Sequence, residues 1–209
     1  MNKDIIDHFE RSWKEYDEWY ETHPAIYQSE LAALAQVIPS GAGLEIGVGT
    51  GRFAVPLGVR FGLDPAIPML KLSRRRGILA VQGLGESLPF KDESFDFVQI
   101  VFVIEFVDHI VPFLREAVRT IRRKGDLILG FIDRDSSWGQ YYARESTHRE
   151  NFHPPSPKQI LMIFQDIGLE FREAFQTLFQ APAHIGPEEE PLAGFGKGGF
   201  VVFAATKKR

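Results

Sequence analysis

The sequence contains no cysteine. This absence excludes disulfide bonds, thiolate catalysis and cysteine-ligated metals, and it is compatible with a reducing cytoplasm. The chain also lacks a long apolar run, because its most apolar stretch, Phe97 to Val107, is interrupted by Gln99 and Glu105. Such a stretch is too short to cross a bilayer and predicts a central strand. The N-terminus shows no signal-peptide pattern, so we expect a cytoplasmic protein with no membrane partner.

Positive charge is not in excess. The chain has 24 Lys and Arg against 28 Asp and Glu, a net charge of -4, and therefore no electrostatic attraction to nucleic acid or to an anionic membrane. Metal-ligand spacing is lacking as well. His148 and His153 stand five residues apart, and Asp133 with Asp135 does not make a site alone. We expect neither a nucleic-acid partner nor a bound metal.

Strand and helix patterns alternate along the chain as far as about Ile132. The length of 209 residues and a hydrophobic share of 44% suit one α/β domain with a sizeable core. The alternation predicts a doubly wound, Rossmann-like and mostly parallel sheet, with helices on both faces and a ligand at the carboxyl ends of the strands. Residues 170–179 and 200–206 predict two closing strands that pair antiparallel. We expect residues 1–209 to form a single domain.

Two segments stand outside this alternation. Residues 1–40 predict a helical cap, with one amphipathic helix over residues 4–20 and a second over about 26–38. The first helix carries an aromatic face that includes Tyr16, and this face either packs on the core or caps a ligand site. Residues 134–157 form a long insertion after the fifth strand. Long insertions in compact domains are often functional, which favours a lid over an ordinary surface helix.

A glycine-rich loop follows the first predicted strand. Gly47, Gly49 and Gly51 alternate, so the backbone can turn sharply and approach a ligand without a Cβ clash. The amides of the helix expected next would favour an anionic group. Two ligand-binding interpretations compete with a plain strand-to-helix turn. One is a dinucleotide loop running from Gly49 to Ala54, and the other is a loop that includes the acid Glu45, two residues before its first glycine.

An acid also ends the second predicted strand. Asp64 lies 19 residues after Glu45. In nucleotide-binding α/β folds an acid at this place accepts hydrogen bonds from ribose hydroxyls. The alternative is that Asp64 caps the next helix, predicted over Met69 to Arg76. Between the loop and this strand stands Pro56, so we expect the first helix of the alternation to be short or bent.

Four motifs along the chain occur together in one known family. They are the loop Glu45-x-Gly47-x-Gly49-x-Gly51, Glu86 before Leu88-Pro89-Phe90, Phe95-Asp96-x-Val98, and Glu116 with Arg122 ahead of Lys124-Gly125. From about Glu45 to Asp133 the chain resembles the class I S-adenosylmethionine-dependent methyltransferases, in particular the ubiquinone and menaquinone biosynthesis type. Dehydrogenases do not share the motifs that follow the loop.

The resemblance implies a seven-stranded sheet of order 3-2-1-4-5-7-6 with the last strand antiparallel. It also implies S-adenosylmethionine as the cofactor and transfer of its methyl group. The cofactor-binding residues that it implies are Tyr16, Glu45, Gly47, Gly49, Thr50, Gly51, Asp64, Pro65, Met69, Gly85, Glu86, Val103 and Phe106.

One position departs from the family pattern. Leu84, two residues before Glu86, stands where the family commonly has an Asp that contacts the adenine amino group. Leu84 has no side-chain acceptor for that hydrogen bond. We expect adenine to be held by backbone groups at Gly85 and Glu86, or by the Glu86 side chain itself.

Candidate catalytic bases follow the fourth strand. Glu105 interrupts an apolar strand end, where a lone carboxylate is costly unless it has a function or a partner. Arg134 is such a partner, and catalysis is the alternative role. His109 is the second candidate, with Asp108 expected to cap the next helix. Phe106 is expected in a pocket wall, where an aromatic face attracts a sulfonium, and Phe102 in the core.

The acceptor is expected to be a small molecule. Aromatic residues flank the cofactor motif on both sides in sequence, as the two halves of an enclosing pocket would; they are Tyr16, Trp19, Trp138, Tyr141 and Tyr142. Arg144 and Arg149 either meet a substrate carboxylate or phosphate, or lie on an exposed helix face. Two other functions stay open from the sequence: an NAD(P)-dependent oxidoreductase, and a relative that binds the cofactor without transferring its methyl group. The sequence does not specify an oligomeric state.

Overall fold

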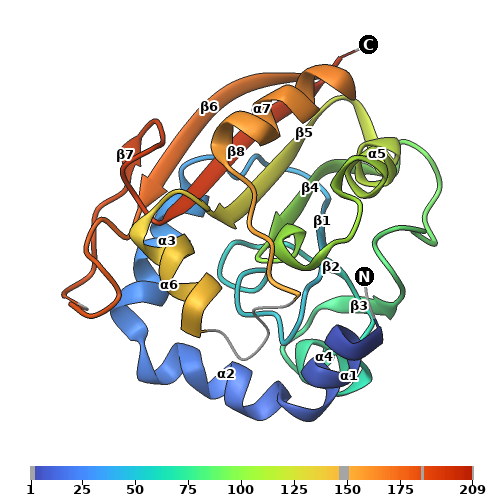
Figure 1. The fold of residues 1–209 in the computed structure, drawn as a ribbon. Helices are drawn as coiled ribbons and strands as arrows, with labels where there is room; N and C mark the ends of the chain where they lie inside the picture. Colours follow the sequence, from blue (N-terminus) through green and yellow to red (C-terminus); the bar gives the residue numbers. More distant parts are fainter. Residues whose placement is uncertain (1–2, 146–150, 185, 209) are drawn as a thin grey trace.

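The fold is built on one sheet of eight strands, as a computed structural model of residues 3–145, 151–184 and 186–208 describes it (Figure 1). The strand order is β3-β2-β1-β4-β5-β8-β6-β7. The strands are β1 (Gly43–Ile46), β2 (Phe61–Asp64), β3 (Leu79–Gln82), β4 (Phe95–Val101), β5 (Ile121–Ile132), β6 (Leu169–Thr177), β7 (Leu192–Ala193) and β8 (Phe200–Lys207).

Strand directions agree with the expected doubly wound sheet. Strands β1 to β5 pair in parallel, and β8 is antiparallel to both β5 and β6. This confirms the predicted order and the antiparallel last strand. The one difference is β7, a two-residue strand within the loop after β6, which pairs with Phe175 and Gln176 and adds an eighth strand at the edge. The carboxyl ends of β1, β2 and β4 therefore meet at one edge of the sheet.

Helices cover both faces of this sheet. On one face, Phe113 and Leu114 of α5 and Phe164 of α7 pack with inward side chains of β1, β4, β5 and β8. On the other, Leu34 of α3 and Leu70 of α4 pack with the opposite side chains of β4, β5 and β8. The helices are α1 (Lys3–Arg11), α2 (Trp13–Thr22), α3 (Pro24–Ala35), α4 (Ile67–Arg75), α5 (Ile110–Thr120), α6 (Ser137–Glu145) and α7 (Pro157–Asp166).

Three local predictions are wrong. The single helix expected over residues 4–20 is two helices, α1 and α2, which meet at Ser12. The short helix expected after the glycine loop is a series of turns over residues 52–58, where Pro56 removes a helical donor and Gly58 has φ +72°. The apolar run does not continue as a strand, because β4 ends at Val101 and a 3-10 turn, η1 (Ile104–Phe106), follows.

Ion pairs hold α2 against the glycine loop. Arg52 binds Asp17 with Nη2 at 2.7 Å and Glu21 with Nη1 at 2.6 Å. Arg76 binds Asp17 at 2.7 Å and donates to the Thr50 carbonyl at 2.9 Å. Partial burial alone would raise the pKa of Asp17, but its hydrogen bonds from the two arginines hold it well below the usual range. The ionised carboxylate thus joins α2, the loop and the end of α4.

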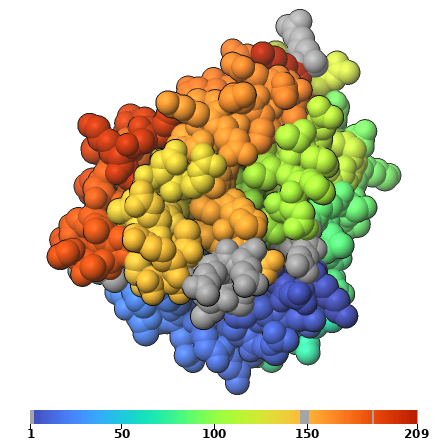
Figure 2. Space-filling view, in the orientation of Figure 1, coloured from blue at the N-terminus to red at the C-terminus, as the bar shows by residue number. Residues whose placement is uncertain are grey.

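The N-terminal segment, blue in Figure 2, forms one edge of the face shown there, with α6 in yellow beside it and α7 in orange toward the opposite edge. Among the residues that the structure describes, no helix has the length and apolarity that a membrane crossing requires.

Candidate functional site

The glycine loop turns tightly at the carboxyl end of β1. Gly47, Gly49 and Gly51 have φ values of +75°, +50° and +87°, a region that side chains with a Cβ rarely adopt. The Gly47 amide donates to the Leu63 carbonyl of β2 at 2.7 Å. A Cβ added at Gly47 would collide with the Val103 side chain. Glycine is therefore required here both by the backbone angle and by the close approach of the chain after β4.

Asp64 links this loop to the segment after β2. Its Oδ2 accepts the Gly49 amide and its Oδ1 accepts the Ala66 amide, each at 2.8 Å. The carboxylate does not cap α4, whose N-cap is Ala66, so that alternative is wrong. Burial raises the pKa of Asp64 to about 6 despite the two amide donors. Each carboxylate oxygen keeps a further lone pair, which suits it to accept ribose hydroxyls.

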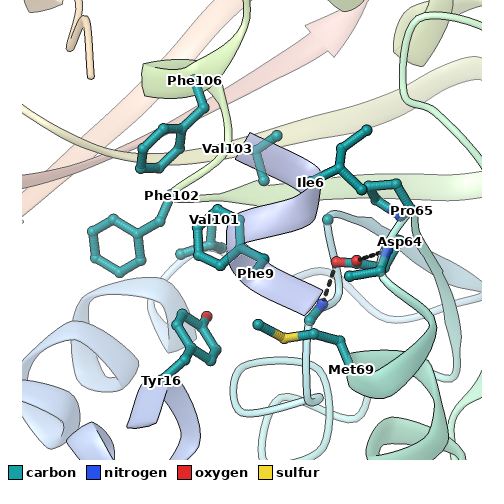
Figure 3. A pocket seen from close by; sticks show the side chains of 13 residues that line it. Ile6, Phe9, Tyr16, Asp64, Pro65, Met69, Val101, Phe102, Val103 and Phe106 are labelled. Carbon is teal, nitrogen blue, oxygen red and sulfur yellow. Dashed lines mark hydrogen bonds between the residues drawn. The ribbon is translucent and has the colours of Figure 1, made fainter. Parts of the chain in front are cut away.

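A cavity opens beside Asp64 at the carboxyl ends of β1, β2 and β4. Figure 3 shows α1 passing across it and the two hydrogen bonds of Asp64 at its wall. Predicted cofactor residues that line it are Tyr16, Gly47, Gly49, Asp64, Pro65, Met69, Val103 and Phe106; Ile6, Phe9, Ala66, Val101 and Phe102 line it too and were missed. Ile6 and Phe9 lie on the apolar face of α1, so the helical pattern alone was a usable signal for them.

Five predicted cofactor residues do not line this cavity. Glu45, Thr50, Gly51, Gly85 and Glu86 stay outside it. Glu45 is buried within the sheet, where desolvation raises its pKa to about 8. Thr50 is fully buried, and Gly51 faces Ser73 and Ile78 on and beside α4.

The loop that carries Leu84 follows β3, and the amide of the neighbouring Gly83 donates to the Asp64 carbonyl at 3.2 Å. Gly85 is buried so closely against Phe113 that a Cβ there would collide with the ring. Leu84, in contrast, is 42% exposed and does not belong to either core cluster. The side chain at position 84 is therefore free of tight packing, and its replacement by Asp is sterically acceptable.

A second cavity, of about 370 Å³, adjoins the first. The two share Phe9, Tyr16, Phe102 and Phe106 as a common wall. The second is also lined by His8, Ser12, Glu15, Trp19, Tyr20, Glu30, Glu105, Ile132, Tyr142 and Phe152. It is thus formed by α1, α2 and α3, together with the end of β5, η1, α6 and the chain after α6.

The aromatic residues expected around a pocket separate into two groups. Tyr16, Trp19 and Tyr142 line the second cavity. Trp138 is buried elsewhere, with its Nε1 donating to the Gln180 carbonyl at 2.7 Å, and Tyr141 is 42% exposed. Tyr141 lies on another face of α6, whereas Trp138 shares the face of Tyr142 and contacts its ring at 5.9 Å between centroids without lining the cavity.

Of the two expected arginines, the structure describes only Arg144, which does not support a site for an anion. Arg144 is exposed and donates to the Gln140 carbonyl of its own helix at 3.1 Å. Arg149 and His148 lie outside the described residues. Within the described part of the chain, no group of three His, Asp or Glu residues is arranged to hold a metal.

Glu105 lies in the wall of the second cavity. Its side chain is fully buried, its Oε1 accepts the Ile132 amide at 2.9 Å, and burial raises its pKa to about 7. Arg134 is not its partner, because that arginine contacts Asp135 at 3.4 Å. Glu30 of α3 lines the same cavity and is 3% exposed. Sequence reasoning missed it, although an acid within the apolar stretch from Ile26 to Leu34 was a weak signal.

His109 does not join these residues. It is exposed at the N-cap of α5 and opens on a separate surface hollow, together with Asp108. The expected cap by Asp108 is wrong, since α5 begins at Ile110 with His109 in the cap position and no side-chain cap bond.

Phe102 separates the two cavities and has a strained backbone. Its φ is +55°, an uncommon value for a bulky residue, and its amide donates to the Gly130 carbonyl at 3.0 Å. Such strain is found where the surrounding structure fixes a functional geometry. Phe102 was expected in the core, and its ring does pack against the buried rings of Phe53 and Phe200, but it also lines both cavities.

The sheet order, the glycine loop and the acid at the end of β2 define a class of protein: a doubly wound α/β protein with a nucleoside-cofactor site at the carboxyl ends of its central strands. Comparison with known proteins agrees. Residues 44–129 match the family model described as a methyltransferase domain. An uncharacterized protein of Methanocaldococcus jannaschii is 40% identical over 203 residues, with 95% of this chain and 98% of that protein covered.

A solved structure from Thermotoga maritima, described as a "SAM-dependent methyltransferase, possible histamine N-methyltransferase", superposes with a TM-score of 0.91 at 41% identity, over 96% of this chain and 98% of that one. A ubiquinone/menaquinone biosynthesis C-methyltransferase of Stenotrophomonas maltophilia is 28% identical, over 91% of this chain and 72% of that protein. The chain belongs to the S-adenosylmethionine-dependent methyltransferases. Because the chain belongs to this family of enzymes, the methyltransferase interpretation is kept, and the oxidoreductase and non-enzymatic alternatives are not.

Proposed function

We propose that this methyltransferase transfers the methyl group of S-adenosylmethionine to a small molecule bound in the second cavity. The observation that carries this proposal is the common wall of Phe9, Tyr16, Phe102 and Phe106 between the cofactor cavity and a neighbouring cavity of about 370 Å³. That volume is within the usual range for a small-molecule site. A polymer such as RNA would need an open, basic surface instead.

The residues present suit the cofactor. Bound S-adenosylmethionine supplies a methyl group already activated on a sulfonium sulfur. Asp64 would accept hydrogen bonds from the ribose hydroxyls of the cofactor, and the backbone of the Gly47–Gly49 turn could approach the cofactor closely. Phe102 and Phe106 would present aromatic faces to its positive charge.

Alignment and exclusion of water are the protein's main contributions to the transfer. The reaction is an in-line displacement, so the acceptor atom must lie on the far side of the methyl carbon from the sulfur. Tyr20 donates its hydroxyl proton to the Tyr16 oxygen at 2.9 Å, which fixes the Tyr16 ring between the two cavities. The aromatic wall keeps the reacting atoms away from water.

Residues 134–157 would act as the lid of the acceptor cavity. Tyr142 of α6 and Phe152 after it line that cavity, and their rings contact each other at 5.8 Å between centroids. Phe152 in turn meets Phe106 of η1 at 5.6 Å. These rings connect the insertion to the wall of the cofactor site, which supports a coupling between lid closure and alignment.

Two measurements test the proposal. Calorimetry should detect S-adenosylhomocysteine binding and no NAD binding. Incubation of a cell extract with the enzyme and methyl-labelled cofactor should place label in the small-molecule fraction. Label on RNA or protein with none in that fraction would refute a small-molecule acceptor, while the family assignment would stand on the calorimetry.

A further inference from the structure

The acceptor cavity contains two buried carboxylates within an aromatic enclosure. Glu30 is 3% exposed and Glu105 is fully buried, and both line the cavity. Among the described residues, no hydrogen-bond donor reaches Oε2 of either side chain. A buried carboxyl oxygen without a hydrogen-bond partner destabilises the folded protein. Two such oxygens, one from Glu30 and one from Glu105, belong to side chains that line the same cavity.

The rest of the cavity wall is suited to positive charge. Of the described residues that line it, none is a lysine or an arginine. Glu15 adds a third acid, on the exposed side of α2. The rings of Trp19 and Tyr20 meet at 5.2 Å between centroids, and aromatic faces of this kind attract organic cations. The other titratable groups on the wall are His8, Tyr16, Tyr20 and Tyr142.

We propose that the methyl acceptor is a small organic amine that enters as an ammonium ion and is held between Glu30 and Glu105. This proposal rests on the proposed function, since it names the acceptor class of the same cavity. Burial raises the pKa of both side chains in the free protein, and a bound ammonium ion would lower both pKa values again, as an alcohol or a carboxylic acid would not. The amine nitrogen becomes a nucleophile when the ammonium ion loses a proton.

The two carboxylates have different positions and different roles. Glu105 lies on η1 between Val103 and Phe106, which line the cofactor cavity, so it is next to the place of transfer. Its Oε1 is fixed by the Ile132 amide, and its Oε2 is available for a proton. Both acids line only the acceptor cavity, but Glu30 lies on α3, which contributes no residue to the wall of the cofactor cavity. Glu105 is therefore the proton acceptor, and Glu30 anchors the cation.

The transfer step conserves atoms and charge. The ammonium R–NH3⁺ gives one proton to Glu105, and the freed nitrogen lone pair attacks the methyl carbon. A nitrogen–carbon bond forms while the carbon–sulfur bond breaks, and its electron pair stays on sulfur. The products are R–NH2–CH3⁺ and neutral S-adenosylhomocysteine, and the proton on Glu105 then leaves to water.

A panel of size-matched acceptors tests this assignment. Methyl-labelled cofactor is supplied with phenethylamine, phenethyl alcohol or phenylpropionate, and melting temperatures of the S-adenosylhomocysteine complex are measured with each. We expect label only on the amine, and stabilisation of the complex only by the amine. Label on the alcohol or the acid but not on the amine would overturn the proposal. So would the lack of both label and stabilisation with the amine, provided that S-adenosylhomocysteine binds. If S-adenosylhomocysteine itself does not bind, the proposed function fails first.

Isosteric variants separate the two roles. Glu30→Gln should raise KM for phenethylamine by roughly 30-fold, the size expected when one side of a buried charge pair is removed. Glu105→Gln keeps an acceptor for the Ile132 amide but cannot take the proton, so kcat should fall by at least about 100-fold. Glu18→Gln, at an exposed position of α2 outside the cavity, is the matched control. Unchanged kinetics in both cavity variants, with unchanged affinity for S-adenosylhomocysteine, would refute the proposal.

Discussion

Replacement of Asp64 by alanine should weaken both the fold and cofactor binding. The substitution removes the acceptor of the Gly49 and Ala66 amides, each bound at 2.8 Å in a side chain that is 8% exposed. Each buried amide left without an acceptor costs about 1–3 kcal/mol, so the free energy of unfolding should fall by at least about 2 kcal/mol. Loss of the ribose contacts should reduce affinity for S-adenosylhomocysteine by a further 1.5–3 kcal/mol or so, about tenfold to 150-fold.

Denaturant unfolding and calorimetry measure the two effects separately. Asp64→Asn should be intermediate in both, because an amide side chain keeps one acceptor oxygen. Asp166→Ala, at an exposed position at the end of α7, is the control and should change neither quantity. Full affinity in Asp64→Ala with reduced stability would show that Asp64 only supports the loop. Unchanged stability would contradict the importance of its two amide hydrogen bonds.

Other predictions concern the same site. Gly49→Val should abolish S-adenosylhomocysteine binding in calorimetry, because valine is strained at φ +50° and its Cβ would point at the Tyr16 ring, 3.6 Å away at the cavity wall; retained affinity would contradict this. Leu84→Asp should bind the same ligand equally well or more tightly, since position 84 is 42% exposed and an acid supplies an adenine acceptor; a large loss would show that Leu84 itself packs on the ligand. The free protein should lose stability as pH rises, because burial raises the pKa of Glu105 to about 7 and that of Glu45 to about 8, above the 4.5 of an exposed glutamate. The protonated side chains contribute their full stabilisation below about pH 4.5, and this stabilisation is lost as the pH rises through the two folded-state pKa values. For Glu105 alone the loss is up to about 3 kcal/mol. Denaturant midpoints that stay level or rise between about pH 5 and 8 would refute this.

The sequence determined the class of fold and the frame of the cofactor site. Its alternation of apolar segments, with Gly47 and Gly49 after the first strand and Asp64 after the second, predicted a mostly parallel sheet with these residues at one edge. The strand order was implied by the family resemblance, and the structure confirms it. The motifs after the loop then distinguished a methyltransferase from a dehydrogenase.

Tertiary structure alone decided the second cavity, which we propose holds the acceptor. Glu30 comes from the third helix, Glu105 from the turn after β4 and Tyr142 from the insertion, and no sequence period relates them. A glutamate on a helix is usually exposed, and its burial depends on which segments pack over it. The kink at Ser12 that turns α1 across the cofactor cavity, and the left-handed backbone of Phe102, likewise come from packing between distant segments. Local propensity does not encode these contacts, because the free energy that fixes them arises only once the segments meet.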